Sequence, residues 1–208
     1  MTKEIEDGVP AGWAFPFVIG GSVVGHSSFP PALLPGSFNP LHHGHLALAA
    51  AAEKHLALPV AFELSVANVD KPEMADDEVA RRVAQFDGVG RVWVTRAATF
   101  AAKAKLFPGA AFVVGHDTAA RLIDPKYYLG EPALRDAALR TLAAGGCRVV
   151  VGGRVDAGGA FRTWGSDALP AEFTTLFVPL AEADFRADVS STALRADVSS
   201  AARRAGRG

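Results

Sequence analysis

The chain has 208 residues, half of them hydrophobic, and a formal net charge of -1 at pH 7. A chain of this length can bury one sizeable core, so we expect a single soluble domain. The near-neutral charge disfavours nucleic acid polymers and acidic membranes as partners, and the apolar run at 14–25 is too short and too interrupted by proline and glycine to span a bilayer.

Short apolar runs alternate with helical patterns along the chain. The expected strands are "ALLP" up to Pro35 and residues 60–66, 91–95, 111–115, 147–153 and 174–179. The expected helices are 44–56, 76–86 with Asp76 or Asp77 as its cap, 98–106, 117–123, and 131–144 closed by Gly145 and Gly146. This alternation predicts an α/β fold, a Rossmann-like, doubly wound, mostly parallel sheet with helices on both faces and a ligand site at the carboxyl ends of the strands.

Residues 1–31 have a different pattern, with glycine, proline and serine scattered among short apolar runs. We expect them to form an arm or hairpin appended to a domain of residues 32–208. The single cysteine, Cys147, cannot form an intrachain disulfide, and the N-terminus lacks the pattern of a secretion signal. These features favour a cytoplasmic protein.

The stretch "GSFNPLHHGH" follows the first strand of the expected domain and leads into a helix. Gly36 allows a tight turn there, and Gly44 keeps side-chain bulk away from the start of the helix. Free N–H groups and the helix dipole favour an anion at this position, and His42 and His45 can add donors aimed at phosphate oxygens. We expect His43 to point away. The alternative is a set of surface histidines that bind a transition metal adventitiously.

A second polar stretch, "VSSTALR", lies near the C-terminus. Ser190, Ser191 and Thr192 are good residues for the start of a helix, where their hydroxyls and the following N–H groups can hold phosphates, and Arg195 lies one turn further on. A plain helix cap is the alternative reading. No order of Ser, His and Asp and no pair of catalytic carboxylates suggests covalent catalysis, so direct displacement is the expected chemistry.

"GSFNPLHHGH" resembles the Gly-x-Phe-Asn/Asp-Pro-x-His-x-Gly-His signature of the nucleotidylyltransferase superfamily, and "VSSTALR" is similar to its second motif. The asparagine of "FNP" and the "SST" triplet look most like the nicotinate or nicotinamide mononucleotide adenylyltransferases. The resemblance implies adenylyl transfer from ATP, accompanied by Mg²⁺, to the phosphate of a small acceptor, with His42 and His45 as the catalytic residues. It further implies nucleotide contacts from Gly36, Ser37, Phe38, Asn39, Ser190, Ser191, Thr192 and Arg195.

"FVVGHDTAARL" is similar to the Gly-x-Asp element of the same enzymes, which implies that Gly115 and Asp117 contact the nucleotide. Capping of the next helix is the alternative for Asp117. Those enzymes often carry a tryptophan that stacks on the pyridine, and "LIDPKYY" has none, so Tyr127 or Tyr128 is the expected replacement. In the resembling enzymes a lysine near this point faces phosphate, which implies that Lys71, in the loop after the second expected strand, contacts the acceptor phosphate. An exposed lysine is the alternative.

Two other functions stay open. The chain could be a cytidylyltransferase that acts on a phosphorylated alcohol, or a nucleotide-binding regulator without turnover. The expected partners are ATP and a small phosphorylated substrate, and a homo-oligomer stays open. No residues are expected to ligate a resident metal ion.

Overall fold

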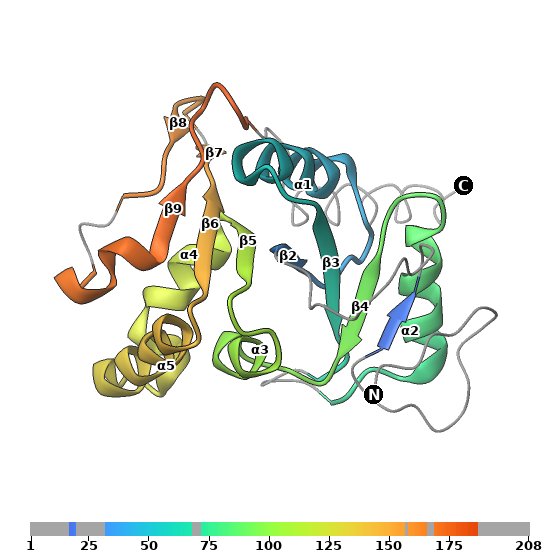
Figure 1. The fold of residues 1–208 in the computed structure, drawn as a ribbon, viewed down its shortest axis with the longest axis horizontal. Helices are drawn as coiled ribbons and strands as arrows, with labels where there is room; N and C mark the ends of the chain where they lie inside the picture. Colours follow the sequence, from blue (N-terminus) through green and yellow to red (C-terminus); the bar gives the residue numbers. More distant parts are fainter. Residues whose placement is uncertain (1–16, 20–31, 68–71, 157, 166–168, 187–208) are drawn as a thin grey trace, which may run out of the picture.

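The computed structural model of the chain describes residues 17–19, 32–67, 72–156, 158–165 and 169–186. Their centre is a seven-stranded sheet in the order β1-β4-β3-β2-β5-β6-β9 (Figure 1). The strands are β1 (Phe17–Ile19), β2 (Ala32–Pro35), β3 (Val60–Ser65), β4 (Val92–Thr95), β5 (Ala111–Gly115), β6 (Arg148–Gly152) and β9 (Phe177–Pro179). All neighbours pair in parallel except β1, which pairs antiparallel to β4 at one edge.

The α-helices of the described ranges are α1 (His43–Leu56), α2 (Asp76–Val83), α3 (Phe100–Leu106), α4 (His116–Ile123) and α5 (Pro132–Ala144). The short helices η1 (Ala84–Phe86), η2 (Pro125–Tyr128) and η3 (Ala171–Leu176) are 3-10 turns, and β7 (Arg154–Val155) and β8 (Phe161–Arg162) form a separate hairpin. Among the described residues, no helix combines the length and the apolar character that crossing a membrane requires.

The core has two parts, one on each face of the sheet, because neighbouring side chains of a strand point to opposite faces. Phe62 and Leu64 of β3 belong to the part that α1 and α2 cover. Ala61 of the same strand belongs to the part that α3, α4 and α5 cover. The predicted doubly wound α/β fold with helices on both faces is therefore confirmed.

Several predicted boundaries differ from the structure. The strand expected at 174–179 begins only at Phe177, because the preceding residues form η3 and bury Phe173 and Leu176 at the three-residue spacing of a 3-10 helix. The cap of α2 is Ala75, and the two aspartates proposed as caps lie in the first helical turn, where they face the positive end of the dipole. The hairpin of β7 and β8 was not predicted. Residues 17–19, within the expected N-terminal arm, form β1.

Within the part of the chain that the structure describes, Glu63 and Lys103 form a buried ion pair. Glu63 of β3 and Lys103 of α3 are 1% and 5% exposed. The Lys103 ammonium donates to both oxygens of Glu63 at 2.8 Å and to the carbonyl of Ala97 at 2.7 Å, and the hydroxyl of Thr95 also donates to the carboxylate. Each proton of the ammonium therefore has an acceptor, as a buried charge requires.

Loss of one partner of this pair should be costly. We expect Lys103→Met to lower the free energy of unfolding by about 3 to 5 kcal/mol, because it leaves the Glu63 carboxylate charged, buried and uncompensated. Urea denaturation measures the change. Arg140→Ala, which breaks an exposed 2.8 Å ion pair with Glu172, is the control and should cost less than about 1 kcal/mol. Equal losses in the two variants would contradict the argument.

Candidate functional site

The order in which the chain adds strands to the sheet reverses between β2 and β5. From β2 the chain continues to β3 on one side, and from β5 it continues to β6 on the other. In open α/β sheets, ligands bind beyond the carboxyl ends of the strands at such a switch point. "GSFNPLHHGH" follows β2 and "GHD" follows β5, so the fold brings two of the predicted motifs to this one position.

The loop after β2 is anchored by a buried aromatic ring. Phe38 is 0% exposed, and its ring makes edge contacts with Phe62, Phe86 and His45. A Cβ atom at Gly36 would lie 2.7 Å from this ring, so the glycine is required for the packing, and its N–H donates to the carbonyl of Glu63 at 2.9 Å. Phe38 itself has a φ of 44°, in the left-handed region that is unfavourable for a bulky residue.

Two of the three histidines lie together. His42 is the N-cap of α1 and His45 the third residue of the helix, and their rings stack at 3.7 Å with an interplanar angle of 23°. The backbone N–H of His42 donates to Nδ1 of His45 at 3.3 Å, so a neutral His45 carries its proton on Nε2. His43 is exposed, as expected. The pair therefore lies at the N-terminus of α1, the positive end of the helix dipole.

Burial favours the neutral form of both stacked histidines. Burial, followed by the nearby His42, lowers the pKa of His45 to about 4. Burial and then His43 also lower the pKa of His42. A neutral imidazole can donate one hydrogen bond and accept another, so each ring can offer an N–H to an anion.

Asp117, in the segment after β5, forms an ion pair with Arg154. Gly115 is the N-cap of α4, and Asp117 lies in the first turn, where its carboxylate accepts from Nη1 of Arg154 at 2.7 Å. Burial and then Arg154 lower the pKa of His116. Nothing in the sequence pattern singled out Arg154, although its place two residues beyond β6 puts it at the ligand edge of the sheet.

The two tyrosines proposed for the acceptor lie elsewhere. Both belong to η2, which is separated from Gly115 by α4, a helix about 12 Å long. Tyr127 is 51% exposed, with the ammonium of Lys126 5.0 Å from its ring centre. The hydroxyl of Tyr128 donates to the carbonyl of Leu122 at 2.9 Å. The structure does not bring these rings together with the histidine pair.

Five other residues proposed for the site lie outside the described residues. They are Lys71, Ser190, Ser191, Thr192 and Arg195.

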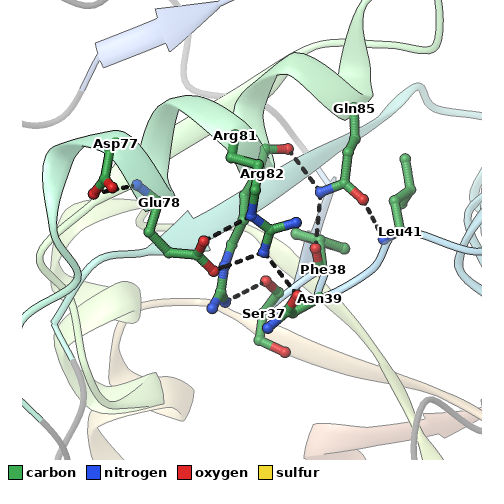
Figure 2. Close-up of polar contacts among 9 residues, drawn as sticks. All are labelled: Ser37, Phe38, Asn39, Leu41, Asp77, Glu78, Arg81, Arg82 and Gln85. Carbon is green, nitrogen blue, oxygen red and sulfur yellow. Dashed lines mark hydrogen bonds and ion pairs between the residues drawn. The ribbon is translucent and has the colours of Figure 1, made fainter. Parts of the chain in front are cut away.

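Helix α2 and η1 hold the loop after β2 by polar contacts that sequence reasoning missed (Figure 2). Arg82 donates from Nη1 to the carbonyl of Ser37 at 2.7 Å, and Arg81 donates from Nη2 to Oδ1 of Asn39 at 2.8 Å. Both guanidinium groups also bind the carboxylate of Glu78, and these hydrogen bonds lower the pKa of that carboxyl to about 2.

Gln85, in η1, completes these contacts. Its Nε2 donates to the carbonyl of Phe38 at 2.9 Å, and its Oε1 accepts from the N–H of Leu41 at 2.8 Å. Most of the contacts from α2 and η1 go to backbone atoms of the loop. No residue type in the loop reveals such contacts, so no sequence signal could have found them.

A Rossmann-like sheet whose switch point carries a glycine-containing loop, a helix N-terminus and neutral histidine donors defines an α/β protein that handles phosphate groups. The chain belongs to the cytidylyltransferase-like family, whose model matches residues 33–197. The protein is therefore a nucleotidyltransferase, an enzyme that acts on a nucleoside triphosphate and a phosphorylated substrate. No curated protein matches the chain.

The lowered pKa of His45 makes the stability of the protein depend on pH. Below about pH 6.5 the histidine is protonated in the unfolded chain but stays neutral in the folded protein down to about pH 4. We therefore expect the free energy of unfolding to fall as the pH drops through this window, and to fall less steeply in His45→Gln. Urea titrations of both proteins at a series of pH values measure the difference, and parallel curves would show that His45 is not held neutral.

Proposed function

We propose that the protein transfers the adenylyl group of ATP to the phosphate of nicotinate or nicotinamide mononucleotide and releases pyrophosphate. The observation that carries this proposal is the stacked pair of neutral imidazoles, His42 and His45, at the N-terminus of α1 and at the switch point of the sheet. The likeness of "GSFNPLHHGH", with its asparagine before the proline, to the pyridine mononucleotide enzymes supports the choice of acceptor.

The reaction needs no covalent intermediate. An oxygen of the acceptor phosphate attacks the α-phosphorus of ATP, the bond from that phosphorus to the bridging oxygen breaks, and pyrophosphate leaves with the electron pair. Negative charge grows on the non-bridging and bridging oxygens as this happens. His45, whose Nε2 carries the proton, and His42 would donate hydrogen bonds to these oxygens, and the N–H groups at the start of α1 would add to the stabilisation.

Mg²⁺ would enter with the triphosphate. Phosphate oxygens are ligands that Mg²⁺ prefers, and enzymes commonly bind the ion through the phosphates of a substrate. When bound, it neutralises charge on the phosphates. We propose that Ser190, Ser191, Thr192 and Arg195 hold the β- and γ-phosphates, and that Lys71 contacts the acceptor phosphate.

The nucleotide would lie against the segment after β5. The carboxylate of Asp117 can accept hydrogen bonds from ribose hydroxyls once its exposed ion pair with Arg154 opens, which costs little because exposed ion pairs are weak. Arg154 would then be available to the phosphates. The backbone of Gly36, Ser37 and Phe38 would provide the remaining nucleotide contacts on the β2 side.

A substrate panel tests the proposal. ATP and CTP are each combined with nicotinate mononucleotide, nicotinamide mononucleotide, phosphopantetheine and a phosphorylated alcohol, and pyrophosphate release is measured with Mg²⁺ present. We expect release, and a dinucleotide product, with ATP and a pyridine mononucleotide. Release only with CTP and the phosphorylated alcohol would establish the cytidylyltransferase alternative, which the family description also fits. Binding of ATP without release in any combination would favour a regulator.

Replacement of His45 tests the catalytic assignment. We expect His45→Ala to lower kcat by about 10² to 10³ and to change the KM for ATP much less, because the hydrogen bond strengthens as charge develops in the transition state. His43→Ala is the matched control, since His43 lies in the same turn but is exposed. Equally small effects at both positions would end the catalytic assignment.

A further inference from the structure

We propose that Gln85 is a positioning residue for the histidine pair, acting through the turn from Phe38 to Leu41. The expected effect of Gln85 on the reaction rate rests on the proposed function, whereas its expected effect on the positions of the His42 and His45 rings does not. Gln85 lies in η1, directly after α2, and its side chain reaches the turn (Figure 2).

The side chain of Gln85 bridges the two ends of the turn. Its Nε2 donates to the carbonyl of Phe38 at 2.9 Å, and its Oε1 accepts from the N–H of Leu41 at 2.8 Å. The second proton of the amide goes to the carbonyl of Arg82 at 3.1 Å, which fixes the orientation of the side chain against its own helix. A primary amide can donate and accept at the same time, which neither a carboxylate nor an ammonium can do.

The turn needs such support because its backbone is strained. Phe38 has a φ of 44°, and a bulky residue persists in this region only where its surroundings hold it there. Its buried ring packs against Phe62 and Phe86. Ring packing fixes the side chain of Phe38, and Gln85 fixes its carbonyl, so the residue is held from two directions.

Both ends of the turn lead to a histidine. The Phe38 ring makes an edge contact with the ring of His45, with 5.1 Å between their centres. Leu41, whose N–H Gln85 holds, directly precedes His42, the N-cap of α1. A displacement of the turn therefore moves the donors of both imidazoles, and misplacement by about 1 Å can cost on the order of 10²-fold in rate.

A second anchor supports the same assignment. Arg82, only 13% exposed in its side chain, donates to the carbonyl of Ser37 at 2.7 Å while it is paired with Glu78. Together, Arg82 and Gln85 bind backbone groups of Ser37, Phe38 and Leu41. The loop after β2 is thus held by side chains of α2 and η1.

Gln85→Met is the sharpest variant, because methionine keeps the length and bulk of the side chain and removes its hydrogen bonds. We expect kcat to fall by about 10- to 100-fold, with the KM values of both substrates within about threefold of wild type. Arg140→Ala, on the exposed surface of α5, is the control and should keep the wild-type kcat. Assays are run well below the thermal midpoint of each protein.

The second readout needs no activity. Stacked rings shift each other's resonances, so imidazole NMR signals of His42 and His45 should move in Gln85→Met while that of His55, at the far end of α1, stays in place. If the methionine variant does not fold, Gln85→Glu, which keeps the acceptor for Leu41 and loses the donor to Phe38, takes its place.

The outcomes separate this inference from the proposed function. Shifted histidine signals with a lowered kcat support it. A folded Gln85→Met protein with wild-type kcat, or with unchanged signals of His42 and His45, overturns it, and a lower thermal midpoint alone would show a role in stability only. If wild-type protein releases no pyrophosphate with any substrate pair, the proposed function fails, and the NMR comparison alone decides the role of Gln85.

Discussion

The ring of Phe38 fastens the loop after β2 to the hydrophobic core, and the geometry of the site depends on this contact. The ring is completely buried, and it packs against Phe62 of β3 and Phe86 of η1. Its burial requires a left-handed backbone at Phe38 and a glycine at position 36, where any side chain would meet the ring. Burial of a phenylalanine ring contributes roughly 1.5 to 3 kcal/mol, which offsets a strain of similar size.

Much of the fold could be predicted because its strands are continuous apolar runs. In β5 and β6, residues 112–114 and 149–151 are apolar and buried, so no polar face confuses the period of the pattern. Residues 174–176 were misassigned because "TTL" is β-branched and apolar, and only the burial of Phe173 and Leu176 shows that the segment turns as a 3-10 helix. The strands β7 and β8 have two residues each, too few for any periodicity.

The candidate site, like the fold, could be predicted only in part. His42 and His45 could be predicted because a helix start, a glycine-containing loop and the histidines are adjacent in sequence. The contacts of Arg82 and Gln85 with the loop could not, because they join residues more than 40 positions apart and end on backbone N–H and carbonyl groups, which reveal nothing in the sequence. Charged residues on one face of a helix usually face solvent, so the sequence of α2 does not indicate that its arginines contact the loop after β2. The pairing of Asp117 with Arg154 also depends on two strands becoming neighbours in the sheet.

The neutrality of the histidine pair connects this architecture to the proposed chemistry. Two imidazolium rings stacked at 3.7 Å would repel each other, and burial next to Phe38 further disfavours their charge. In the free protein the rings are therefore neutral hydrogen-bond donors, and the positive end of the α1 dipole attracts phosphate. Negative charge that develops on the phosphate oxygens would strengthen the N–H···O hydrogen bonds that the neutral rings donate, because hydrogen bonds to charged acceptors are stronger than those to neutral ones. These hydrogen bonds would therefore stabilise the transition state more than the bound substrates. The effect requires that the loop hold both rings in position before the reaction begins.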